Sequence, residues 1–304
     1  MALGSYRFDL GSFRCLCLSD GAFNYPVGSF FANVPREQVQ ETLRRHGLPT
    51  EQITTPYTLL LVDTGSHRVL VDTGAGNLGE HAAALFPSVD HSTTVTGTLL
   101  DNLRASEIEP SDIDRVVITH AHPDHIGGTL DGSGKLVFGD AHYFISQDEW
   151  DFWTSEVAAA KASPPMVNIA RQNLEPIRDR LTFIDDGAEI VPGIRAIATP
   201  GHTPGHIALS IASEGERLLH VSDAVLYQLH LEYPQWTPVF DISPEQAAAS
   251  KRRIFDEAAE PEVLVFAHHF PPFPNLGRIL DKEEGWLWRP TEDTAGQPSA
   301  RGEI

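Results

Sequence analysis

One short motif constrains this chain more than any other part of its sequence. Four side chains that can bind a metal lie within six residues: His120, His122, Asp124 and His125. The preceding segment 113–119 is rich in Val and Ile and predicts a buried strand. Two glycines follow the motif, so the chain can turn there toward a short helix. We therefore expect these side chains on a loop between a strand and a helix, converging on one point.

Further metal-capable residues follow downstream. They are His202 within TPGHTPGH, Asp223 within HVSD, and the pair His268 and His269 after a Val-rich segment. The H-x-H-x-D-H motif, followed by these residues in this order, resembles the signature of metallo-β-lactamase-fold hydrolases over nearly the whole chain. The resemblance implies an α/β (α+β) fold, a four-layered αβ/βα sandwich in a single domain. The strands expected before and after the motif, each group followed by helices, are consistent with two packed sheets.

The resemblance also implies which residues bind metal. His120, His122 and His202 would hold one ion, Asp124, His125 and a late histidine a second, and Asp223 would bridge the two. Asp124 and Asp223 are the candidate catalytic carboxylates, and a hydroxide held between the ions would attack an acyl or phosphoryl centre. Asp72, in an Asp-Thr-Gly turn, and His206 are expected to support ligands without binding metal. A nitrogen and oxygen donor set without thiolate favours two Zn²⁺ ions, with Mn, Fe or Co as alternatives, and no other cofactor is expected.

The last ligand is open between two neighbours. Strand alternation places His268 and His269 on opposite faces and does not choose between them. The following FPPFPNLG run resembles the methyl parathion hydrolase branch, where a histidine just before such a run is the ligand. That comparison indicates His269. The extra proline, Pro271 or Pro272, departs from the branch pattern and keeps His268 as the alternative.

Charge and composition narrow the partners. The chain has 304 residues and a formal net charge of −20, which argues against nucleic acid or an anionic membrane and favours a small-molecule substrate. The sequence leaves room for a homodimer. Cys15 and Cys17 are the only cysteines, too few for a zinc ribbon, and would share one strand face. Without a recognisable signal peptide or a membrane-length apolar run, we expect a cytoplasmic protein. We expect one hydrolase domain over 1–291 and a polar tail over 292–304.

The function that the resemblance implies is hydrolysis. A bridging carboxylate at Asp223 differs from true β-lactamases, which leaves esterase, lactonase, organophosphate hydrolase or thioesterase. The segments 199–206, 236–241 and 273–277 resemble the branch that holds methyl parathion hydrolase and N-acyl homoserine lactonase-like enzymes. The alternatives are an iron-dependent persulfide dioxygenase, a glyoxalase II-like thioesterase, and a binding protein without catalysis.

Local patterns add expectations about individual segments. Residues 6–10 and 13–18 predict a hairpin that ends at 19–21. Residues 23–31 predict a loop, whose aromatic side chains either line a pocket or pack on the sheet. Residues 35–47 predict a helix, and Ser243 with Gln246 predicts a capping box at the start of another.

Overall fold

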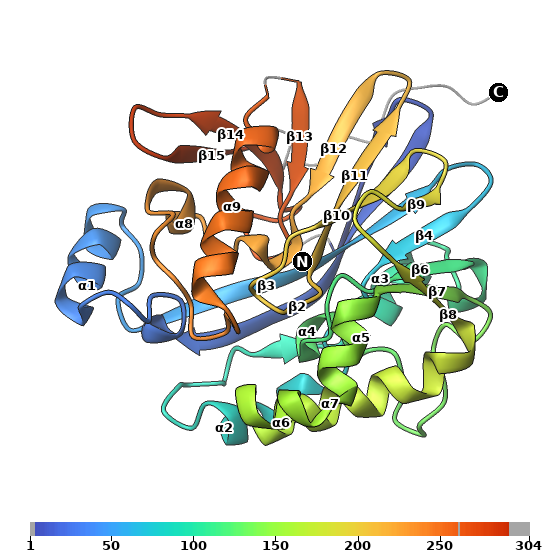
Figure 1. Cartoon of the computed structure of the whole chain (residues 1–304), viewed down its shortest axis with the longest axis horizontal. Coiled ribbons are helices and arrows are strands. Elements are labelled where there is room, and N and C mark those ends of the chain that lie inside the picture. Colours follow the sequence, from blue (N-terminus) through green and yellow to red (C-terminus); the bar gives the residue numbers. More distant parts are fainter. Residues whose placement is uncertain (1–3, 261, 292–304) are drawn as a thin grey trace.

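The computed structural model describes residues 4–260 and 262–291, and two β-sheets pack face to face at its centre (Figure 1). In the first sheet the strands follow the order β1 (Ser5–Leu10), β2 (Phe13–Pro26), β3 (Gln52–Asp63), β4 (Arg68–Val71), β6 (Arg115–Val117), β7 (His142–Ser146) and β8 (Leu181–Ile184), with β5 (Val95–Thr96) paired to β2. In the second sheet the order is β15 (Trp286–Pro290), β14 (Leu276–Asp281), β13 (Val263–Phe266), β12 (Glu216–His220), β11 (Ile207–Ser213), β10 (Ile194–Ala198) and β9 (Glu189–Val191).

Side-chain alternation explains why these strands are apolar on both faces. Leu60 and Val62 of β3 point into the core between the two sheets, whereas Leu59 and Leu61 point outward beneath helices. Successive side chains of a strand face opposite sides, so a continuous apolar run is what a sheet covered on both faces requires. Cys15 and Cys17 share the inner face as expected, and both are free and buried.

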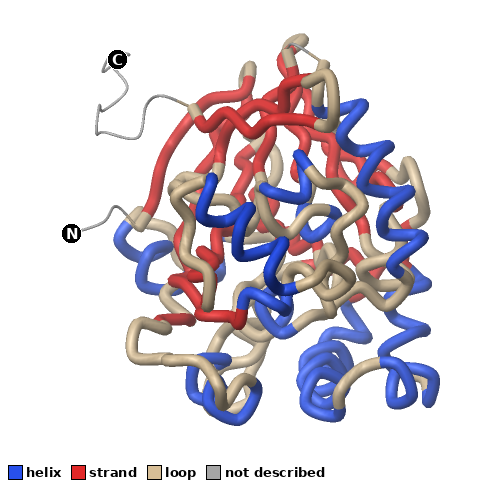
Figure 2. The backbone as a smooth tube through the Cα atoms, turned by 90° about the vertical axis from the view of Figure 1, so that its left-hand side faces the viewer, coloured by secondary structure: helices blue, strands red, loops and turns tan. Residues whose placement is uncertain are grey.

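Helices cover the outer face of each sheet. The first sheet is covered by α3 (Leu99–Ala105), α5 (Gln147–Thr154), α6 (Glu156–Lys161) and α7 (Pro164–Leu174), and the second by α9 (Pro244–Ala258). Figure 2 shows the strands side by side in the upper part of the view, with helical segments beside and below them. Helix, sheet, sheet and helix make four layers, which confirms the expected αβ/βα sandwich. The remaining helices are α1 (Arg36–Arg45), α2 (Ala82–Leu85), α4 (Pro123–Ile126) and α8 (Leu229–Glu232).

The expected hairpin is present, and the pairing between its strands ends at Ser5 and Leu18. The second strand was expected to end there as well, and that prediction was wrong. Strand β2 continues to Pro26, pairing with β3, and its register shifts between Ser19 and Gly21. Gly21 has φ +100°, and a Cβ there would lie 1.9 Å from the carbonyl oxygen of Val95, so only glycine fits this bulge. The bulge also places Asp20 so that its carboxylate accepts hydrogen bonds from the backbone N–H groups of Ala75 and Leu99.

Other local expectations had mixed outcomes. The helix expected over 35–47 is present as α1. The capping box expected at Ser243 is not formed, because the Ser243 side chain makes no capping hydrogen bond. The expected tail 292–304 lies outside the described residues. Within the described part of the chain, no helix is long and apolar enough to cross a membrane.

Candidate metal centre

The H-x-H-x-D-H motif begins on the loop after strand β6 and runs into helix α4, so His120 and His122 lie on the loop and Asp124 and His125 in the helix. His122 is the residue before the helix and Pro123 is its first residue, a position that suits the fixed φ of proline. The motif is followed by Gly127 and Gly128, and these positions have no room for a side chain because the neighbouring 72–75 loop approaches closely. A Cβ on Gly128 would lie 2.1 Å from the carbonyl oxygen of Thr73. The two glycines therefore let this loop pack against the motif.

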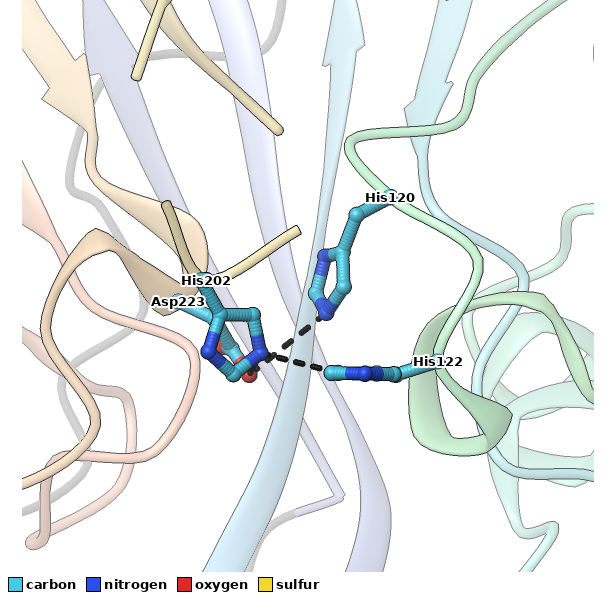
Figure 3. A group of neighbouring side chains, drawn as sticks. All are labelled: His120, His122, His202 and Asp223. Atoms are coloured by element: carbon cyan, nitrogen blue, oxygen red, sulfur yellow. Dashed lines mark hydrogen bonds and ion pairs between the residues drawn. The ribbon is translucent and has the colours of Figure 1, made fainter. Parts of the chain in front are cut away.

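Four side chains from distant parts of the chain form a first group: His120, His122, His202 and Asp223. Each offers a ligand atom, and these atoms all lie within 4.8 Å of one another. His202 Nε2 lies 2.8 Å from His122 Nδ1 and 3.3 Å from Asp223 Oδ2. Figure 3 shows the three imidazole rings and the carboxylate directed toward a common centre. All four side chains are buried.

A second group lies beside the first and contains Asp124, His125, His268 and His269. The Nε2 atom of His269 is 3.4 Å from Asp124 Oδ2, and that of His125 is 3.8 Å from the same oxygen. His125 Nε2 and His120 Nε2 are buried without a hydrogen-bond partner among the described residues. Buried polar atoms of this kind are rare in folded proteins and here face other ligand-type atoms.

Asp223 lies between the two groups. Its Oδ1 is 3.3 Å from Nε2 of both His125 and His269, in the second group. Its Oδ2 is 3.3 Å from His202 Nε2 and 3.7 Å from His120 Nε2, in the first group. One carboxylate thus presents a different oxygen to each cluster of histidines, which is the arrangement that a bridging ligand needs.

The two late histidines have different surroundings. His269 Nδ1 is 3.1 Å from the carbonyl oxygen of Pro56, an acceptor that holds a hydrogen on Nδ1 and leaves Nε2 as the atom that faces Asp124 and Asp223. His268 stacks on His125, with ring centroids 4.2 Å apart. Both of its ring nitrogens lack a hydrogen-bond partner among the described residues. The contacts of His269 with Asp124 and Asp223 support it as the last ligand, whereas the unpartnered nitrogens of His268, which belongs to the same group, keep it as the alternative.

Asp72 and His206 contact the cluster from outside. Asp72, at φ +63°, accepts hydrogen bonds from the backbone N–H and the hydroxyl of Thr119, and its Oδ2 lies 2.7 Å from His125 Nδ1. His206 Nε2 accepts the backbone N–H of Asp223 at 3.1 Å, and its Nδ1 lies 2.7 Å from Thr199 Oγ1. Each residue thus orients one metal-type ligand without itself facing the centre.

Two further supporting carboxylates were not predicted from the sequence. Asp241 Oδ1 lies 2.9 Å from His202 Nδ1, so it orients that ring as Asp72 orients His125. Glu149 is fully buried in α5 and accepts hydrogen bonds from four groups, namely the backbone N–H of Ala121 and Gly205, the Thr203 hydroxyl and the Trp153 indole N–H. It ties the two loops that carry His122 and His202 to one helix.

Opposing charges set the pKa values in the cluster. Burial by itself would lower the pKa of His202 and His269, but the facing carboxylates outweigh it and raise each pKa to about 9. Burial would also lower the pKa of His125, but the nearby carboxylates, Asp223 above all, outweigh burial and raise this pKa well above its usual range. The pKa of Asp223 falls well below its usual range, since the neighbouring imidazoles outweigh the effect of burial. In the absence of metal, protons on these rings would balance the buried carboxylates, and a bound cation would replace them.

A cavity of about 330 Å³ opens onto this cluster. The metal-type residues His122, Asp124, His202, Asp223 and His269 line one side of it. The other walls are largely apolar and include Phe23, Tyr25, Phe30, Leu78, Phe86, Leu226 and Phe240. The aromatic segment expected to be a loop is therefore partly strand, and its side chains both pack in a buried cluster and line the cavity.

The fold and the cluster define a metallo-β-lactamase-type protein, and comparison with known proteins agrees. The chain belongs to the metallo-beta-lactamase superfamily, whose family model matches residues 55–268. A beta-lactamase-like protein 2 homolog of Caenorhabditis elegans is 27% identical over 242 residues, which cover 75% of this chain and 68% of the relative. An N-acyl homoserine lactonase of Bacillus thuringiensis is 24% identical over 233 residues, or 73% of this chain and 84% of the relative.

Solved structures extend the likeness over more of the chain. AidC, a dizinc quorum-quenching lactonase in complex with a product, is 28% identical with a TM-score of 0.84, covering 95% of this chain and 97% of that one. The hydrolase AbOPH of the beta lactamase superfamily is 26% identical with a TM-score of 0.82, covering 96% and 98%. The expected family and its lactonase relatives are thereby confirmed.

Proposed function

We propose that this protein is a hydrolase that depends on two divalent metal ions and cleaves an ester bond in a small apolar substrate. A lactone is the first candidate, followed by an open-chain ester or a phosphotriester. The observation that carries the proposal is the position of Asp223, whose two oxygens face the two histidine clusters separately. The dizinc lactonase among the similar structures supports the same assignment.

The donor set fits two such ions. His120, His122 and His202 would hold one, and Asp124, His125 and His269 the other, with Asp223 shared. The unpartnered nitrogens of His120 and His125 and the unpartnered Oδ1 of Asp223 are the atoms that cations would satisfy. An imidazole and carboxylate set without thiolate suits Zn²⁺, and the same donors accept Mn, Fe or Co. When bound, two ions would lower the pKa of a water held between them and polarise the substrate oxygen that gains negative charge.

The protein's own residues would then bind the substrate and move the proton. Asp124 lines the cavity, and the facing imidazoles of His125 and His269 outweigh burial and lower its pKa, so it is ionised at neutral pH. We assign it the role of accepting a proton from the attacking water and passing it to the leaving oxygen. The apolar walls, with Phe86 and Phe240 among them, would hold the alkyl part of the substrate and exclude bulk water.

A substrate panel tests this function. Freshly purified protein should hydrolyse at least one member of a set of alkyl lactones, aryl esters and phosphotriesters, with a smaller rate on glutathione thioesters and β-lactams. Dialysis against a chelator should abolish turnover, and Zn²⁺ should restore it. Full turnover after verified removal of metal would refute the proposal. Oxygen uptake with glutathione persulfide, in protein holding one iron per chain, would support the dioxygenase instead.

A further inference from the structure

The wall of the cavity formed by β2 and β3 carries two hydroxyl groups. Tyr25 and Thr55 both line the cavity, on neighbouring strands where Thr55 pairs with Phe23. The hydroxyl of Thr55 is buried and has no hydrogen-bond partner among the described residues. Tyr25 adds a phenol to the same wall, and the carboxylate residues Asp124 and Asp223 line this cavity as well. This wall is therefore equipped to bind more than an alkyl chain.

The ring of Tyr25 is held in place by aromatic neighbours. Its centroid lies 5.5 Å from that of Phe30, 5.2 Å from Phe86 and 5.7 Å from Phe240, each at a steep angle to the Tyr25 ring. Edge-to-face contacts on several sides leave the ring little room to turn. The position of the Tyr25 hydroxyl in the cavity is thus fixed by packing.

The direction of the Tyr25 hydroxyl hydrogen follows from its partner. The hydroxyls of Tyr25 and Tyr57 are hydrogen-bonded to each other. Tyr57 is fully buried, its ring lies against His269, and in the described part of the chain its hydroxyl bonds to Tyr25 alone. Tyr25 lines the cavity and can donate to water or a ligand there, whereas Tyr57 does not line it, and a buried hydroxyl that does not donate leaves a costly unsatisfied hydrogen. We therefore assign the donor role in this pair to Tyr57. The hydrogen of Tyr25 is then left to point into the cavity, where water or a ligand can accept it.

We propose that Tyr25, oriented by Tyr57, donates a hydrogen bond to an oxygen of the substrate beside the metal centre and thereby selects substrates with an acceptor at that point. The inference rests on the proposed hydrolase function. Tyr25 would touch the substrate, whereas Tyr57 is a positioning residue that acts only through Tyr25.

A double-mutant cycle tests this arrangement in the zinc-loaded protein, with γ-decalactone as substrate. Tyr25→Phe should lower kcat/KM by about 10-fold, the size expected for one lost hydrogen bond, without changing the metal content. Tyr57→Phe should lower kcat/KM by a smaller factor, because the hydroxyl hydrogen of Tyr25 is then no longer held toward the substrate. Adding Tyr57→Phe to Tyr25→Phe should have no further effect, since the residue that Tyr57 orients is gone. As a matched control, Tyr227→Phe removes a hydroxyl from the same aromatic cluster, outside the cavity lining, and should leave kcat/KM unchanged.

A binding measurement separates this inference from the proposed function. Calorimetric titration with 4-hydroxydecanoate, the ring-opened form of γ-decalactone, needs no turnover, and Tyr25→Phe should weaken its binding by a similar factor. If the parent binds this acid but hydrolyses nothing, the proposed function fails and the inference stands on the binding result. If Tyr25→Phe keeps both turnover and binding within about twofold, or if the two substitutions act additively, the inference is wrong. A parent that neither binds nor hydrolyses would overturn both.

Discussion

Replacing Asp223 by asparagine tests the role of the carboxylate that lies between the two histidine clusters. The substitution keeps the shape of the side chain and replaces one carboxylate oxygen by an amide nitrogen. In the structure both oxygens are in use, with Oδ1 3.3 Å from His125 and His269 and Oδ2 3.3 Å from His202. Asp223→Asn therefore removes the shared negative charge and one of the two ligand atoms together.

The size of the effect follows from Coulomb's law at these separations. Two unit charges about 4 Å apart interact by about 4 kcal/mol at an effective dielectric constant of about 20. Losing such an attraction, and leaving the two ions to repel each other, should weaken binding of one ion by about 3 kcal/mol or more, at least about 100-fold in affinity. We expect kcat to fall by about two orders of magnitude or more for the same reason.

The assay is metal affinity and turnover measured on the same preparations. Competition with a chromophoric chelator gives the two dissociation constants, and the lactone that the parent hydrolyses best gives kcat. Asp63→Asn, which removes a carboxylate that pairs with Arg14 and Arg68 away from the cluster, serves as the control and should change neither quantity. An Asp223→Asn protein with two tightly bound metals and a rate near that of the parent would show that Asp223 does not bridge.

Three other predictions concern the same site. His269→Ala should lose the second metal and most turnover, whereas His268→Ala should keep both, as metal analysis of the two variants will show; the reverse outcome would assign the ligand to His268. In metal-free protein, the raised pKa values of His202 and His269, about 9 each, should contribute stability that is fully present below about pH 6.5 and lost as pH rises to 9. Urea unfolding should show this loss, and zinc affinity should rise over the same pH interval. An unfolding free energy that does not change with pH would contradict this. Glu149→Gln replaces an acceptor of two backbone N–H groups and two side-chain donors by an amide, and should lower the free energy of unfolding by about 1–3 kcal/mol in metal-free protein; an unchanged unfolding curve would refute that role.

The sequence was informative where a residue's role depends on its local neighbours. The motif at 120–125 runs from a strand end into a short helix because the Val and Ile residues before it, Pro123 within it and the two glycines after it specify that local structure. The helix at 36–45 was predicted from apolar spacing and a proline near its start, and the helix at 244–258 from Ser243 and Pro244 at its start, although its capping box is not formed. Strands β3 and β4 have continuous apolar sequences because both faces of each strand are buried.

The features that were missed depend on contacts between distant residues. Strand β2 continues past Asp20 because Phe23 pairs with Thr55, a partner that no local pattern reveals. Asp241 meets His202 although the two are 39 positions apart in the sequence, and Glu149 meets Thr203 at a separation of 54 positions. Acidic residues of this kind look like ordinary surface charges in a sequence, and only burial beside a histidine or a backbone N–H group distinguishes them. The contact that sets His269 apart from His268 is likewise made with a distant residue, Pro56 of the opposite sheet.

The most direct test of the central claim is a metal titration of the chelator-treated protein followed by turnover. The chain should bind two zinc ions, and activity on the best ester or lactone should reach its plateau only when both ions are bound. A crystal of the saturated protein, measured at the zinc absorption edge, should then show two anomalous peaks with Asp223 between them. Full activity at one ion per chain, or a single peak that Asp223 does not contact, would contradict the account.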